Sequence, residues 1–160
     1  MPTTIAATVD PVRSLVEART AGGQPIRMDA DPPEGEDRAA GPKETLLASL
    51  AGCTAMDVAS ILRKKRQSAS SYELRVSAES AEEHPRVFTD ITVIHVVSGE
   101  VEPEPLRRSI ELSATHYCPV NAMLSAVARI EHRYRLTDAD GTLHEARVAV
   151  IGPDRAVSVG

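Results

Sequence analysis

The chain has 160 residues, enough for one domain with a substantial hydrophobic core. Its apolar content of 42% and charged content of 26% are ordinary for a soluble globular protein. A net charge of −5, with three Tyr, one Phe and no Trp, argues against a nucleic-acid partner, since single-strand binders stack bases on aromatic rings.

The N-terminal part is predicted to form three short strands. They cover residues 4–9, 14–18 and 25–28, with turns at Asp10-Pro11 and Gly22-Gly23. A polar loop rich in Pro and Gly follows over residues 30–42. We expect no signal peptide, because the first residues lack a basic start and a continuous apolar run.

A long apolar helix is predicted from Pro42 to about Gln67. It has roughly the length of a short membrane span, but Gly52, Asp57 and several Ser and Thr argue against one. The basic run at residues 63–66 complements the helix dipole at the C-terminal end. We therefore expect a buried central helix and no membrane partner.

The second half alternates strands and helices in separate runs. Residues 72–78 and 87–97 are predicted to pair as two strands, and residues 103–117 to form a helix opened by prolines. A shorter helix after Pro119 should bury its apolar side chains, and a hairpin of residues 130–136 and 143–150 should end the domain. These runs indicate an α+β fold, with one domain over residues 1–152 and a tail over 153–160.

The two cysteines, Cys53 and Cys118, are the side chains that most clearly carry chemistry. They lie too far apart in the sequence for a metal knuckle or a thioredoxin-type motif. Two thiols without a secretory signal favour a reducing, cytoplasmic compartment. Helix-borne thiols in this arrangement are typical of a peroxidatic and resolving pair, although buried cysteines also often only fill space.

The local sequence favours Cys118 as the more acidic thiol. Pro119 disfavours helical backbone at Cys118, which places this thiol at a helix start, where the dipole stabilises thiolate. Cys53 lies in mid-helix, and Asp57, one turn later, would oppose its ionisation.

The segments GPKETLLASLAGCTAMDV and HYCPVNAML resemble the OsmC/Ohr family of osmotically inducible and organic hydroperoxide resistance proteins, in its broad OsmC-like redox branch. The resemblance implies an OsmC-like fold, with antiparallel sheets packed on the central helix, and an intertwined homodimer. It also implies that Cys53 attacks an organic hydroperoxide and that Cys118 resolves the sulfenic acid to a disulfide. A dithiol reductant, of the lipoyl type for example, then restores both thiols.

The same resemblance implies an assisting glutamate and arginine. Lys43 occupies the usual glutamate position, so Glu44, nine residues before Cys53, is the candidate. On a straight helix this spacing spans about 13.5 Å and leaves Glu44 on the opposite side, so a first-turn role at the helix dipole is an equal alternative. The arginine is Arg13, Arg19 or Arg27; Arg13 matches best, and each is otherwise a solvated residue.

No other pattern competes with the cysteines. The five histidines show no metal-ligand spacing, and no phosphate-binding loop or cofactor motif is present, so we expect neither metal nor cofactor. Thiol-dependent peroxidase is the leading hypothesis. The alternatives are a non-enzymatic redox-responsive or ligand-binding protein, and a purely structural role for both cysteines.

Overall fold

A computed structural model describes residues 2–154 and 157–160. The chain divides into two compact units, Met1–Ala48 and Ser49–Gly160. The N-terminal unit holds a small sheet and the first turns of a long helix, and the second unit holds the main sheet, the remaining helices and both cysteines. The expectation of one domain over residues 1–152 stays a prediction.

The small sheet is an antiparallel meander of β1 (Ile5–Val9), β2 (Val16–Thr20) and β3 (Pro25–Met28). β2 begins later than the predicted position because the preceding turn is longer. The Asp10 carboxylate accepts the backbone N–H groups of Val12 and Arg13, and Ser14 adopts a positive φ of 57°. The turn at Gly22-Gly23 is as predicted, with Gly23 in the left-handed region.

The long helix, α1 (Pro42–Lys64), begins where its proline was expected. Its buried side chains form one stripe at intervals of four residues: Leu50, Thr54, Val58 and Leu62. The expected buried central helix is buried along this stripe in the single chain, whereas Met56 on another face is 71% exposed. α1 is also long and apolar enough to cross a membrane, but its stripe packs into the core of the second unit.

The main sheet has the order β4-β5-β6-β7-β8. Its strands are β4 (Ser68–Ser80), β5 (Phe88–Glu100), β6 (Arg129–Thr137), β7 (Leu143–Ile151) and β8 (Val157–Val159). The predicted pairings of β4 with β5 and of β6 with β7 are confirmed. The expectation of a tail over residues 153–160 is wrong for Val157–Val159, which form β8 and pair with β7 at the edge of the sheet.

The expectation of antiparallel sheets holds for the small sheet and for three strand pairs of the main sheet, but β5 and β6 pair in parallel, so the main sheet is mixed. A parallel pair needs a crossover connection. That crossover is formed by α2 (Pro103–Leu112), a π-helical turn η1 (Ser113–Tyr117) and α3 (Pro119–Leu124). This crossover returns the chain from the end of β5 to the start of β6, and Cys118 lies within it, between η1 and α3.

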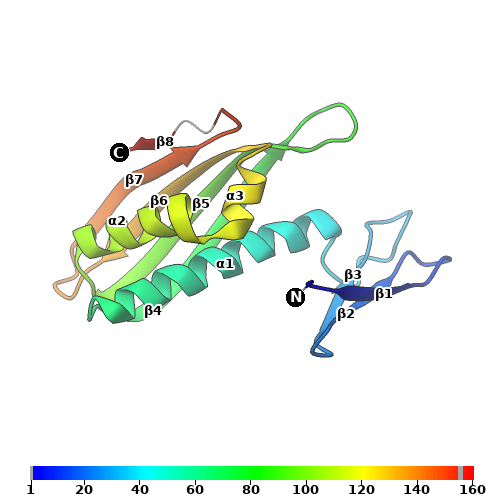
Figure 1. Ribbon diagram of the computed structural model, residues 1–160, viewed down its shortest axis with the longest axis horizontal. Coiled ribbons are helices and arrows are strands. Elements are labelled where there is room, and N and C mark those ends of the chain that lie inside the picture. Colours follow the sequence, from blue (N-terminus) through cyan, green and yellow to red (C-terminus); the bar gives the residue numbers. More distant parts are fainter. Residues whose placement is uncertain (1, 155–156) are drawn as a thin grey trace. The chain divides into compact units, whose positions relative to one another are not determined.

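The core lies between the main sheet and the helices on one of its faces (Figure 1). It joins Val58 and Leu62 of α1 to Leu106 and Ile110 of α2 and to inward side chains of β5, β6 and β7. The predicted inward side chains of β6 are buried: Ile130, His132, Tyr134 and Leu136. The alternation is broken at Glu131, which is also buried and forms ion pairs with Arg129 and Arg133.

Two predictions for the crossover differ from the structure. Tyr117 is 53% exposed and belongs to η1, so α2 ends earlier than expected. α3 leaves Met123 65% exposed and buries Asn121 instead. A buried amide is tolerated only where its hydrogen bonds are satisfied, and those bonds lead to the candidate site.

Candidate active site

α1 places Cys53 and Asp57 one turn apart, on the same side of the helix. Cys53 is half-buried, and Thr54 beside it is fully buried. The Asp57 carboxylate accepts a hydrogen bond of 3.0 Å from the Ser113 hydroxyl at the start of η1. This bond ties α1 to the crossover and fixes the orientation of the carboxylate.

Cys118 is the N-cap residue of α3, as predicted. η1 ends there because Pro119 disfavours helical backbone at the preceding residue, and Cys118 is extended with φ −74° and ψ 105°. Its sulfur accepts a hydrogen bond of 3.3 Å from the backbone N–H of Asn121 and one of 3.7 Å from the Thr54 hydroxyl. The Cys118 side chain is therefore held from both α3 and α1.

These elements bring the two cysteines and Asp57 together. The sulfur atoms of Cys53 and Cys118 and a carboxylate oxygen of Asp57 all lie within 4.8 Å of one another. Both cysteines are free thiols. The fold thus joins two thiols that are remote in the sequence and sets a negative charge beside them.

Burial overturns the expected acidity of Cys118. Its side chain is only 3% exposed, and loss of solvent, together with the hydrogen bond shared with the Cys53 thiol, raises the pKa of Cys118 to about 11. The backbone N–H of Asn121 and the Thr54 hydroxyl oppose this shift but do not cancel it. The prediction from the helix dipole is wrong because desolvation exceeds the stabilisation at the helix start.

A buried chain of hydrogen bonds leads from Cys118 across the sheet. The side chain of Asn121 donates to the carbonyl of Ala114 at 2.8 Å, and its oxygen lies 2.9 Å from Nε2 of His132. Nδ1 of His132 lies 3.2 Å from Nε2 of His95, and Nδ1 of His95 lies 2.8 Å from the Tyr72 hydroxyl.

The partners at the two ends set the direction of this chain. Because the Asn121 amide nitrogen donates to a carbonyl, its oxygen is the acceptor, so His132 carries its proton on Nε2. His95 then donates from Nε2 to His132, and Tyr72 donates to His95. The donors then run in one direction, from Tyr72 through His95 and His132 to Asn121, and this order requires both rings to be neutral.

The electrostatics of the two rings agree with that assignment. Burial lowers the pKa of His132 to about 4 and, together with the neighbouring His132, lowers the pKa of His95 well below its usual value. Burial also raises the pKa of Tyr72, and the Asp57 charge adds to the rise. The four side chains are a neutral network at physiological pH.

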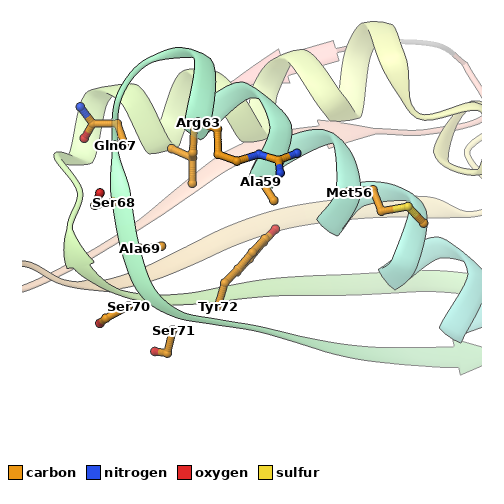
Figure 2. A pocket seen from close by; sticks show the side chains of 10 residues that line it. Met56, Ala59, Arg63, Gln67, Ser68, Ala69, Ser70, Ser71 and Tyr72 are labelled. Carbon is orange, nitrogen blue, oxygen red and sulfur yellow. The ribbon is translucent and has the colours of Figure 1, made fainter.

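Two cavities are lined in part by residues of the network or the cluster, one by Tyr72 and the other by Asp57. One of about 660 Å³ lies between α1 and the start of β4, with Met56, Ala59, Leu62 and Tyr72 in its wall. Figure 2 shows the Tyr72 side chain rising from β4 toward α1. The other, of about 270 Å³, includes Asp57, Lys64 and Tyr117 in its lining, so it reaches the carboxylate of the cluster.

Glu44 has a clear role at the start of α1. Its carboxylate accepts the backbone N–H of Gly41 at 2.8 Å, the reciprocal half of a capping box. This geometry matches the first-turn alternative, and a catalytic role for Glu44 stays a prediction.

The three candidate arginines belong to the N-terminal unit, Met1–Ala48, whereas both cysteines belong to Ser49–Gly160. Arg27 pairs with Glu17 at 2.8 Å, and Arg19 reaches the carbonyl of Gly23 at 3.5 Å. Arg13 lies in the turn between β1 and β2, where its backbone N–H donates to the Asp10 carboxylate. Which of them assists Cys53 stays a prediction.

The buried network was missed by sequence reasoning. His132 occupies an inward position of an alternating strand, and this was the available signal, because a buried histidine needs polar partners. His95 and His132 lie far apart in the sequence, yet the fold brings their ring centroids to 5.6 Å of each other. Ser113, Thr54 and Asn121 carried no signal before the crossover brought them together.

The chain is similar to known proteins over most of its length. The sequence model described as OsmC-like protein matches residues 35–133. The protein YhfA of Escherichia coli strain K12 is 37% identical over 121 residues, which cover 75% of this chain and 88% of YhfA.

Two solved structures illustrate the likeness of the fold. An OsmC-like protein from Mycoplasma pneumoniae has a TM-score of 0.73 at 18% identity and covers 85% of this chain and 97% of its own. A structure from Legionella pneumophila, described as an organic hydroperoxide resistance protein OsmC, has a TM-score of 0.62 at 15% identity, covering 82% and 95%. At these identities the likeness concerns the fold alone.

Proposed function

The chain belongs to the OsmC-like protein family, and on that basis we propose that it is a thiol-dependent peroxidase that reduces organic hydroperoxides. The observation that carries the proposal is the approach of the Cys53 and Cys118 sulfurs to within 4.8 Å of each other. Two free thiols at this separation are suited to pass through a sulfenic acid to a disulfide.

Cys53 is the proposed peroxidatic residue. Its thiolate attacks one oxygen of the O–O bond, which breaks, so that Cys53 becomes a sulfenic acid and the alkoxide leaves as an alcohol after taking a proton. The choice between the thiols rests on access and charge. Cys53 is half-buried, whereas Cys118 is almost fully buried with a raised pKa, which leaves little thiolate for a first attack.

Cys118 is the proposed resolving residue. Its sulfur attacks the Cys53 sulfenic sulfur, a disulfide forms, and the hydroxyl leaves as water with the Cys118 proton. The sulfurs must close to about 2.05 Å for that bond. The junction between η1 and α3 is the part proposed to move, because Pro119 interrupts the helical hydrogen bonds there.

A two-electron reductant must restore the thiols, and we assign this step to a dithiol of the lipoyl type in the cytoplasm. The organic part of the substrate is assigned to the 660 Å³ cavity, where Met56, Ala59 and Leu62 provide apolar wall. The Legionella pneumophila protein, which shares this fold, is described as an organic hydroperoxide resistance protein, and we propose the same substrate class for this chain.

Stopped-flow mixing of the reduced protein with an alkyl hydroperoxide tests the proposal. One equivalent should consume both thiols and produce an intramolecular Cys53–Cys118 crosslink in a peptide mass map, and hydrogen peroxide should react more slowly. In Cys118→Ser protein, a sulfenic-acid probe should label Cys53. If Cys53 passes to sulfinic acid while Cys118 stays free, the two-cysteine mechanism is wrong.

The same proposal includes a homodimer. α1 and the end of the crossover leave large apolar side chains in solvent, with Met56 71%, Met123 65% and Val127 57% exposed in the single chain. A second copy is the proposed cover. Light scattering should give a mass of twice 17.1 kDa at micromolar concentration, and a mass of 17.1 kDa would contradict the dimer.

A non-enzymatic redox-responsive or ligand-binding protein is the second candidate. The Asp57 carboxylate beside both sulfurs favours it, because a nearby negative charge disfavours thiolate. In that case thiol loss with alkyl hydroperoxide should be no faster than that of a free small-molecule thiol, while the disulfide still forms with a dithiol–disulfide buffer.

A further inference from the structure

Beyond the proposed peroxide chemistry, the cluster at the end of the crossover contains the donor atoms of a metal site. Cys53, Asp57 and Cys118 each offer one ligand atom, and all three atoms lie within 4.8 Å of one another. We propose that the reduced protein binds one zinc ion through these two sulfurs and the Asp57 carboxylate.

The spacing of the donors suits a tetrahedral ion. Zinc binds sulfur at about 2.3 Å and carboxylate oxygen at about 2.0–2.2 Å, so ligand atoms around one ion lie about 3.3–3.8 Å apart. Because the donor atoms lie within 4.8 Å of one another, they would have to approach by up to about 1.5 Å to surround one ion. Cys53 and Asp57 are one helical turn apart, a separation that puts two ligands on one side of a helix, and Cys118 supplies the third from another element.

Surrounding groups already orient two of the three ligands. The Ser113 hydroxyl donates to the Asp57 carboxylate at 3.0 Å. The backbone N–H of Asn121 and the hydroxyl of Thr54 both point at the Cys118 sulfur. Donors aimed at a ligand atom fix its direction and stabilise its negative charge, which is the usual arrangement around bound metals.

The donor types select the ion. Two thiolates and one carboxylate favour zinc or another borderline-soft ion over magnesium and calcium, which prefer oxygen ligands alone. Binding is an exchange without oxidation: Zn²⁺ enters, and the two thiol protons leave to solvent. Asp57 also lines the 270 Å³ cavity, and a water molecule is the proposed fourth ligand.

The site would exist only while both cysteines are reduced, because a disulfide has no thiolate to give. Oxidation of the two cysteines to a disulfide would release the ion. Bound zinc would lower the reactivity of both sulfurs toward electrophiles. The inference shares its cysteines with the proposed function but does not depend on peroxide being the substrate.

Titration of the reduced, untagged protein with Zn²⁺ against a chromophoric chelator tests the site. We expect one ion per chain, and with Co²⁺ the visible absorption of a tetrahedral thiolate complex. Zinc should slow alkylation of both cysteines at least about tenfold. Protein blocked at its thiols with N-ethylmaleimide should lose the binding, which provides a comparison without any substitution.

Variants separate this site from unspecific binding by thiols. Asp57→Asn should weaken zinc binding at least about a hundredfold and Ser113→Ala about tenfold, whereas the matched exposed change Asp140→Asn should alter it by less than about twofold. Circular dichroism checks that each variant is folded. Equal affinity of wild type and folded Asp57→Asn, or equal affinity of free and blocked protein, overturns the inference.

The outcome can be told apart from that of the proposed function. Zinc binding is measured without peroxide, and peroxide consumption is measured in the presence of chelator. Zinc affinity without fast peroxide reduction would support the metal site and contradict the peroxidase, and the opposite result would do the reverse.

Discussion

Cys53 and Cys118 contribute the same chemical group to one cluster, yet their surroundings differ in kind. Cys53 lies half-buried on a regular helix, next to the buried stripe and one turn before Asp57. Cys118 lies buried between η1 and α3. Its surroundings include polar groups of α1, η1 and α3. The difference agrees with the proposed roles, in which Cys53 reacts with the substrate and Cys118 reacts afterwards with oxidised Cys53.

Exchanging each cysteine for serine gives the largest expected effect and tests this division directly. Cys53→Ser should lower the rate of alkyl hydroperoxide consumption more than about a hundredfold, because no other accessible thiolate remains. Cys118→Ser should keep the first turnover and lose the disulfide. Single-turnover kinetics with a sulfenic-acid probe measures both, and fast oxidation of Cys118 in the Cys53→Ser protein would reverse the assignment.

Acidic pH should lower the free energy of unfolding through the two buried histidines of the network that leads from Cys118. Unfolded histidines titrate near about 6.5, whereas the folded pKa of His132 is about 4 and that of His95 is also lowered. The unfolded chain therefore binds more protons between these values, so stability is complete above about pH 6.5 and falls as the pH drops toward 4. His132 alone accounts for about 3 kcal/mol of that loss.

Urea denaturation across this pH range measures the effect. His132→Gln should flatten the dependence on pH, and His116→Gln, a change at an exposed histidine, should leave it unaltered. A wild-type stability that does not change between neutral pH and pH 4 would contradict the neutral buried pair.

Asn121→Ala should reduce the difference in reactivity between the two thiols. The change removes the amide that bridges His132 and the Ala114 carbonyl, and leaving buried groups unpaired should cost about 2 kcal/mol of unfolding free energy. Alkylation of Cys118 should become faster while that of Cys53 stays the same. Met123→Ala, at an exposed position on the same helix, should do neither; equal effects from both would point to loss of α3 as a whole.

Tyr72→Phe is the smallest test, at the far end of the network. Loss of its hydroxyl leaves Nδ1 of His95 without a donor, and we expect a cost of about 1 kcal/mol in chemical denaturation. Tyr117→Phe, where the ring is 53% exposed, should change nothing measurable. A neutral result for Tyr72→Phe would show that water replaces this donor.

Local patterns predicted the elements well where one face is apolar and the other polar. Ile130, Tyr134 and Leu136 are inward as their alternation indicated, and Pro42 and Pro119 open helices. The resemblance supplied the family and the cysteine pair. These features depend on residues close together in the chain.

What could not be predicted depends on groups that meet only after folding. The parallel pairing of β5 with β6 comes from the path of the crossover, which no strand pattern encodes. The acidity of Cys118 was misjudged because the helix start is visible in the sequence but its burial is not. Asn121 was passed over because its partners His132 and Ala114 come from two other elements.

The parallel pairing also bears on the order in which the protein folds. β4 and β5 are joined by a short turn and can pair early, whereas β6 must wait until the whole crossover has been laid on the sheet. We therefore expect His132 and Cys118 to reach their partners late, after α1, which carries Cys53, has formed. Until the crossover docks, a newly synthesised chain exposes the Cys118 thiol that the folded protein buries, so we expect its vulnerability to oxidation to be greatest before folding is complete.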